Sequence, residues 1–95
     1  MSPFARRVLD VVDGIPRGKV LAYGDVAELV GAGSARAVGT VMARHGAEVP
    51  WHRVVHADGT CATHKSERQL ELLRAERVPV DGARVDMTRA RWDGR

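Results

Sequence analysis

Apolar positions in the first part of the chain recur at the three- and four-residue spacing of an amphipathic helix. The first run comprises Phe4, Val8, Leu9, Val11 and Val12. It follows Ser2-Pro3, a favourable cap and first-turn proline, and it is ended by Gly14 and Pro16. The pattern therefore predicts a first helix between Ser2 and Gly14.

Two more helices are predicted in the next thirty residues. After a short extended connection over Lys19–Tyr23, an apolar run predicts a short helix that ends at Gly31 and Gly33. Ser34 is a good N-cap for a third helix that runs to about Arg44. The apolar stripe of this helix is formed by Val38, Val41 and Met42. Two short helices around a glycine-rich turn have helix-turn-helix proportions.

The second half of the chain carries weaker periodic signals. Val49–Val55 predicts a buried loop or short strand that leads to a turn at Asp58-Gly59. Ser66 is expected to cap a last helix, which Pro79 follows. The apolar residues of that helix are Leu70, Leu72, Leu73 and Ala75. The tail to Arg95 is expected to be irregular or briefly extended, and 1–95 is predicted to be a single domain.

Composition narrows the class of protein. The single cysteine, Cys61, cannot form an intramolecular disulfide, and no Cys/His spacing of a structural zinc site is present. The sequence shows no signal peptide and no run of roughly 20 apolar residues that could span a membrane. We therefore expect a soluble, cytoplasmic protein without a metal or cofactor.

Arginine dominates the positive charge of the chain. The formal net charge is +3, and the basic residues are thirteen arginines and two lysines. Guanidinium groups favour bidentate contacts with phosphate, which makes nucleic acid a reasonable partner. A GC-rich genome would produce the same composition, so charge alone does not decide between these explanations.

Three sequence blocks carry a more specific signal. They are Gly18–Tyr23 (Gly-Lys-Val-Leu-Ala-Tyr), Ser34–Gly39 (Ser-Ala-Arg-Ala-Val-Gly) and Pro50–Val55 (Pro-Trp-His-Arg-Val-Val). Their order and spacing resemble the C-terminal domain of the O6-alkylguanine-DNA alkyltransferases. The resemblance implies a mainly α, small winged-helix-like domain with a helix-turn-helix.

The third block departs from the family at its reactive position. In the alkyltransferases it reads Pro-Cys-His-Arg-Val, and the cysteine accepts the alkyl group; here that position is Trp51. The tryptophan, together with the missing N-terminal domain, resembles the alkyltransferase-like proteins, which bind alkylated guanine and pass it to other repair machinery. The implied partners are double-stranded DNA containing alkylated guanine and damage-recognition proteins of nucleotide excision repair, bound by a monomer.

The chemistry of Trp51 indicates a protein that is not an enzyme. Dealkylation needs a soft nucleophile, normally an activated thiolate, and an indole supplies none. By resemblance, His52 is the family's base and Glu76 the glutamate that orients it, and both are expected to form a vestigial, structural network. An alternative is an active alkyltransferase that uses Cys61, which lies outside the conserved block.

The resemblance also implies how a damaged base is reached. A protein that inspects or modifies a base within a DNA duplex must first rotate that nucleotide out of the base stack. Arg36 is the implied finger that fills the vacated space, and Tyr23 is the implied residue that drives rotation and then faces the lesion. The alternatives are a solvated surface arginine and a core aromatic residue.

A lesion pocket is implied around Trp51, whose ring would face the alkyl group and the base. The main-chain carbonyls of Trp51 and Val54 would accept hydrogen bonds from the guanine edge. Lys65 would lie near the outer wall, where Thr63–Ser66 replaces the family's Tyr-Ser-Gly-Gly loop. The alternative for Trp51 is a buried core tryptophan.

The third predicted helix is expected to bind the minor groove without reading sequence. Its small residues, which allow close approach of the backbone, are Ser34, Ala35, Ala37 and Gly39. Arg44 is the candidate phosphate contact, so affinity should fall with salt. The alternative function is a sequence-specific helix-turn-helix transcription regulator, which would need base-reading side chains on this helix.

Overall fold

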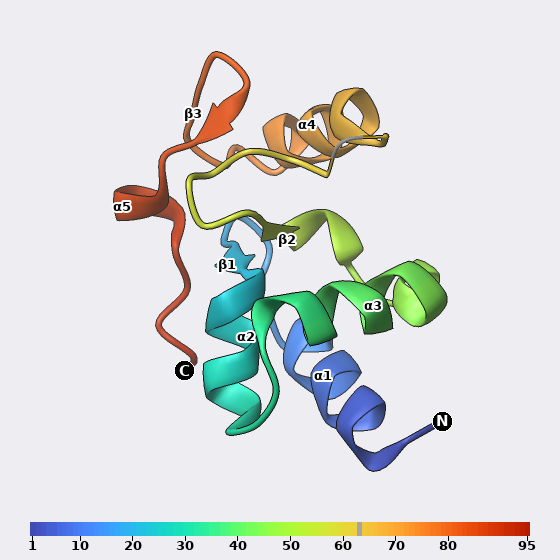
Figure 1. Ribbon diagram of the computed structural model, residues 1–95. Coiled ribbons are helices and arrows are strands. Elements are labelled where there is room, and N and C mark those ends of the chain that lie inside the picture. Colours follow the sequence, from blue (N-terminus) through green and yellow to red (C-terminus); the bar gives the residue numbers. More distant parts are fainter. Residues whose placement is uncertain (63) are drawn as a thin grey trace.

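The computed structural model describes residues 1–62 and 64–95, so the loop prediction at Thr63 lies outside the described residues. In chain order the elements are α1 (Pro3–Asp13), β1 (Leu21–Ala22), α2 (Tyr23–Val30), α3 (Ala35–His45), the 3-10 turns η1 (Gly46–Glu48) and η2 (Trp51–Arg53), β2 (Val54–Val55), α4 (Ser66–Ala75), β3 (Val80–Asp81), β4 (Arg84–Val85) and α5 (Met87–Ala90). Figure 1 shows α1, α2 and α3 packed together, with α4 on the other side of the β1–β2 pair.

Local capping starts and ends the first helix as predicted. The Ser2 hydroxyl accepts a hydrogen bond from the Ala5 N–H at 3.1 Å. The Gly14 N–H donates to the carbonyls of Asp10 and Val11, which terminates α1.

One boundary prediction in the next segment is wrong. The pattern predicts Tyr23 in the extended connection, whereas the structure has it as the first residue of α2. The reason is the Asp25 carboxylate, which accepts a hydrogen bond from the Ala22 N–H at 2.9 Å and starts the helix there. Gly31 ends α2 in the left-handed conformation, at a φ of 82°.

The helix-turn-helix is confirmed. Ser34 caps α3 by accepting a hydrogen bond from the Ala37 N–H at 3.1 Å. The helical core is formed by buried residues of the first three helices, the two short strands and the α1–β1 connection: Ala5, Val8, Val12, Ile15, Leu21, Val26, Ala27, Val30, Val38, Val41 and Val54. Burial of these apolar side chains against one another stabilises the helix packing.

The two-residue parallel ladder between β1 and β2 separates this core from a second one. Leu21 pairs with Val54, and Ala22 pairs with Val55. Because neighbouring strand residues face opposite sides, Leu21 and Val54 point into the helical core, while Val55 points the other way. The second core comprises Val20, Val55, Cys61, Leu73, Val78, Val85 and Ala90.

The C-terminal third contains two departures from the sequence prediction. Ser66 does not cap α4: it is the first helical residue, Lys65 occupies the cap position, and no side chain caps this end. The helix is also not the last one, because α5 follows a β3–β4 hairpin. A one-turn helix is too short for a periodic signal, and α5 depends on its Asp86 cap and on buried Ala90.

The segment after α5 returns along β1. The Val20 N–H donates to the Ala90 carbonyl at 3.0 Å, and the Trp92 N–H donates to the Val20 carbonyl at 2.8 Å. Figure 1 shows this segment passing beside β1 and α2 before the chain ends. None of the helices in the described parts of the chain has the length and apolar character needed to cross a membrane.

The turn predicted at Asp58-Gly59 leads to a testable consequence for stability. Gly59 has a φ of +87°, and an added Cβ would collide with the main-chain carbonyl oxygen of Val85. Gly59→Ala is therefore expected to lower the free energy of unfolding by more than about 2 kcal/mol, measured by urea denaturation. Gly82, at a φ of +61° with open space around it, is the matched control. Gly82→Ala should cost only the roughly 1–2 kcal/mol of a left-handed backbone; equal losses would contradict the close packing at Gly59.

Candidate functional site

A cavity of about 750 Å³ lies between α3 and the chain that follows β2. Its lining residues are Tyr23, Gly24, Ala35, Arg36, Gly39, Thr40, Met42, Ala43, Arg44, Gly46, Ala47, Trp51, His56, Ala57, Ala62, His64 and Lys65. This set includes Tyr23, Arg36, Trp51 and Lys65, which the sequence assigned to lesion recognition. It also includes Ala35, Gly39 and Arg44 from the predicted DNA-binding helix.

The exposed face of α3 forms one side of the cavity. Arg36 lies on the first turn and Arg44 on the last, and both side chains are exposed. Val38 and Val41 point the other way into the helical core. Within the described residues, neither guanidinium has a hydrogen-bond or ion-pair partner. Both arginines are therefore available to an anionic ligand.

Three residues that were predicted to contact DNA or the lesion do not line the cavity. Ser34 is the N-cap of α3, and Ala37 is half-buried one turn further on. Val54 is 1 % exposed, and its carbonyl accepts a hydrogen bond from the Gln69 side chain at 2.8 Å. The Trp51 carbonyl likewise accepts from the Val54 N–H. The contacts of these two carbonyls with a base stay predictions.

Trp51 forms the floor of the cavity. Its side chain is partly exposed rather than buried in a core, and its ring lies edge-on to His52 with centroids 6.1 Å apart. The Lys65 ammonium nitrogen lies 5.1 Å from the centroid of the Trp51 ring, which is cation–π distance. The floor is thus an aromatic surface with a cation at its rim.

Tyr23 lies against His56, a residue that sequence reasoning missed. The two ring centroids are 5.2 Å apart. Burial, and secondarily the neighbouring Cys61, raise the pKa of Tyr23 above its ordinary value of 10.0, so its hydroxyl is protonated at neutral pH. No motif indicated His56, because only the pairing of β1 with β2 brings it beside Tyr23.

Cys61 belongs to the second core and is not part of the cavity lining. It is 8 % exposed. Burial raises the pKa of its thiol, with a smaller opposing effect from Arg74. Nucleophilic attack requires an accessible thiolate, so this environment disfavours the reaction.

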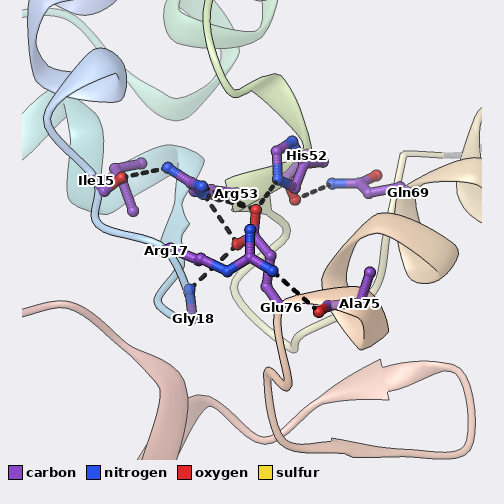
Figure 2. A network of polar contacts seen from close by, with 8 residues as sticks. All are labelled: Ile15, Arg17, Gly18, His52, Arg53, Gln69, Ala75 and Glu76. Carbon is purple, nitrogen blue, oxygen red and sulfur yellow. Dashed lines mark hydrogen bonds and ion pairs between the residues drawn. The ribbon is translucent and has the colours of Figure 1, made fainter.

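Behind the floor, His52 and Glu76 meet as the resemblance implied. The His52 Nε2 and the Glu76 Oε2 are 2.7 Å apart (Figure 2). Sequence reasoning missed that Arg53 belongs to the same network: its Nη2 donates a hydrogen bond to the same Glu76 carboxylate oxygen at 2.8 Å. Arg53 also donates to the Ile15 carbonyl, and the Gly18 N–H donates to Glu76 at 3.1 Å. The network joins η2 and the α1–β1 connection to the end of α4.

Comparison with known proteins adds the family. A family model described as the DNA-binding domain of 6-O-methylguanine DNA methyltransferase matches residues 3–78. The chain belongs to this family.

Relatives within the family are of two kinds. The DNA base-flipping protein of Escherichia coli K12 is 44 % identical over 96 residues, which cover 95 % of this chain and 74 % of that protein. Alkyltransferase-like protein 1 of Schizosaccharomyces pombe is 40 % identical over 87 residues, covering 84 % of this chain and 81 % of that protein. Other relatives carry the name methylated-DNA–protein-cysteine methyltransferase. Family membership alone therefore does not separate enzymes from other members.

A solved structure confirms the expected fold. It is S. pombe Atl1 in complex with damaged DNA containing O6-carboxymethylguanine. The TM-score is 0.86 at 32 % identity, with 98 % of this chain and 97 % of that chain covered. The predicted winged-helix-like domain of the alkyltransferase-like proteins is thus confirmed.

The buried network of this family member determines part of its acid stability. Burial alone would raise the pKa of Glu76, but hydrogen bonds from Arg53, His52 and the Gly18 N–H outweigh it and lower the pKa from 4.5 to about 2. Because the folded-state pKa is depressed, the carboxylate stabilises the fold above about pH 4.5. That contribution is lost as the pH falls toward about 2.

Glu76→Gln is therefore expected to lower the free energy of unfolding at neutral pH by about 3 kcal/mol, the energy that lowering a pKa from 4.5 to about 2 represents. Urea denaturation at a series of pH values measures the effect, and the two proteins should converge as the pH falls below about 4.5. The control is Glu28→Gln on the exposed face of α2, which should change stability by less than about 0.5 kcal/mol. A constant gap at all pH values would refute the role of ionised Glu76.

Proposed function

We propose that the protein recognises O6-alkylated guanine in duplex DNA by rotating the damaged nucleotide into the cavity, and that it transfers no alkyl group. The observation that carries the proposal is the composition of the cavity: it unites Tyr23, Arg36 and Trp51, and its lining among the described residues contains no thiol. An aromatic floor binds a planar base by stacking, which is worth roughly 1–3 kcal/mol per base.

The exposed face of α3 is the proposed DNA contact. Its small residues Ala35 and Gly39 allow the backbone to approach the minor groove, and Arg44 reaches a phosphate. Binding that relies on phosphates weakens with salt and carries little sequence information. The complex of S. pombe Atl1 with damaged DNA supports the binding of damaged DNA by this fold, because the two chains share the fold over almost their full lengths.

Arg36 and Tyr23 are proposed to carry out the rotation. Arg36 lies on the first turn of α3, where an exposed guanidinium can enter the base stack and pair with the orphaned cytosine. Tyr23 lies at the start of α2 on the cavity wall, and its protonated hydroxyl can donate a hydrogen bond to the lesion. The base-flipping name of the E. coli relative supports this step.

The absence of transfer is proposed from the chemistry of the floor. By resemblance, Trp51 in the Pro-Xaa-His-Arg block takes the position of the cysteine of the family's methyltransferases, and its indole lacks the soft nucleophile that removal of an alkyl group from an ether oxygen requires. Because the described lining of the cavity holds no thiol, the His52–Glu76 pair has no nucleophile to activate there and supports the floor instead. A lesion that is bound but unchanged must be handed on; by family analogy we propose damage-recognition proteins of nucleotide excision repair as the partners of a monomer.

The central test compares two duplexes that differ only by an O6-methyl group on one guanine. The protein should bind the methylated duplex at least about tenfold more tightly, a difference of about 1.4 kcal/mol. Fluorescence anisotropy at one fixed salt concentration measures both affinities. Mass spectrometry of both components should show an unchanged lesion and an unchanged protein. Equal affinities would refute recognition, and a protein mass gain of one methylene would refute the absence of transfer.

The rotation step is tested separately with Arg36→Ala and Tyr23→Ala. Each is expected to reduce affinity for the methylated duplex by about tenfold or more, because the unstacking of a base costs a few kcal/mol that these side chains offset. A 2-aminopurine next to the lesion reports unstacking by its fluorescence. Arg89→Ala on α5 is the control, since this exposed arginine lies outside the cavity. Wild-type affinity and fluorescence in both cavity variants would exclude the proposed roles.

A further inference from the structure

Gln69 is the only polar residue that is fully buried in the described part of the chain, with 0 % exposure. It lies in the first half of α4, behind the cavity, and it is not a lining residue. No motif or resemblance indicated it. Burying a side-chain amide in an apolar interior is unfavourable unless its donors and acceptor are all hydrogen-bonded. The hydrogen-bond partners of Gln69 therefore show which parts of the chain it holds in place.

All the side-chain partners of Gln69 are main-chain groups. Its Nε2 donates to the carbonyl of His52 at 3.1 Å and to that of Val54 at 2.8 Å. Its Oε1 accepts from the Ala62 N–H at 2.9 Å. Figure 2 shows the amide directed at the His52 carbonyl. Because all these partners are main-chain groups, the hydrogen bonds of Gln69 fix the position of the backbone itself.

These partners belong to two segments of the chain. His52 and Val54 do not line the cavity themselves, but they follow Trp51 closely in the chain, so two of the bonds hold the backbone that carries the floor. Ala62 and Lys65 form an outer wall together with His64. The Gln69 side chain bonds this outer wall at Ala62, whereas the Gln69 N–H donates to the Lys65 carbonyl at 2.8 Å as the first main-chain bond of α4, which any residue at this position would keep. One residue therefore connects the floor to the outer wall, whose lysine lies 5.1 Å from the Trp51 ring.

We propose that Gln69 is a positioning residue that sets the width of the cavity and thereby the size of O6-alkyl group that it favours. This inference rests on the proposed function. Dispersion contacts weaken sharply when a gap opens by less than 1 Å. A methyl group contacts both walls only when the gap is narrow, whereas a benzyl group reaches them across a wider one. Weakening the hydrogen bonds of Gln69 should therefore reduce the preference for O6-methylguanine more than the preference for O6-benzylguanine.

Gln, Glu and Met have side chains of similar length, so comparing them at position 69 distinguishes a hydrogen-bonded bridge from a role in packing alone. Gln69→Glu keeps part of the bridge, because a buried carboxyl takes up a proton and then donates one hydrogen bond and accepts another. Gln69→Met keeps the shape of the chain but none of these bonds. A role in packing alone predicts similar behaviour for all three proteins, and a bridge predicts a graded series.

The experiment measures affinities for duplexes containing guanine, O6-methylguanine or O6-benzylguanine. The preference for O6-methylguanine over guanine should fall by about threefold in Gln69→Glu and by about tenfold in Gln69→Met, the latter corresponding to about 1.4 kcal/mol. The preference for O6-benzylguanine should fall less in both. Affinity for undamaged DNA should stay within about twofold, since its contacts are mainly with phosphates and α3 packs on the helical core.

Leu73→Val is the matched control on the same helix. Leu73 is 0 % exposed in the second core, so shortening it weakens the packing of α4 without removing a bond between the two walls. Thermal melting confirms folding of each variant, and Gln69→Glu decides alone if Gln69→Met does not fold. Equal losses for all three duplexes, or the same loss of preference in Leu73→Val, would overturn the proposal. A wild-type protein without any preference would instead contradict the proposed function itself.

Discussion

The parallel pairing of β1 with β2 is the constraint on which the rest of the molecule depends. Only two residues of each strand take part, Leu21 with Val54 and Ala22 with Val55. Continuing that register by one residue brings Tyr23 opposite His56, which accounts for the contact between their rings. The same ladder places the start of α2 beside the end of η2. Tyr23 and Trp51, which are far apart in sequence, therefore line one cavity.

Two polar side chains, Gln69 in α4 and Glu76 at its C-terminal end, connect α4 to segments on the other side of the β1–β2 ladder. Glu76 binds Arg53, His52 and the Gly18 N–H, and Gln69 binds the backbone of the floor and of the outer wall. Buried polar groups stabilise only when they are satisfied, and every buried side-chain nitrogen and oxygen among the described residues has a partner. By resemblance, a histidine–glutamate pair serves the reactive thiolate of the methyltransferases. Beside Trp51, we propose that His52 and Glu76 act as a structural support instead.

The first three helices were predictable because their signals are local. Ser2 and Ser34 cap helices within three residues of their own positions, and Gly31 ends α2 through its own φ. The motif blocks also pointed to Tyr23, Arg36 and Trp51, which the structure brings to one cavity, while their roles toward DNA stay predictions. Where a boundary depended on a competing local signal the prediction was wrong: Asp25 moved Tyr23 into α2, and α4 began at Ser66 without a side-chain cap.

The sequence by itself determined the first three helices, because capping residues and apolar stripes are local signals. Its three motif blocks also carried the resemblance that implied the fold class and the replacement of the reactive cysteine by Trp51. Tertiary structure decided the rest. The His56 ring contacts Tyr23 only because β1 pairs with β2. Cys61 does not line the cavity because it is buried in the second core. Gln69 connects the backbone behind the floor to the outer wall because α4 packs against both segments. These relations join segments separated by seven to more than thirty residues. Spacing along a chain carries no signal for such contacts, because they exist only once the apolar cores have brought the segments together.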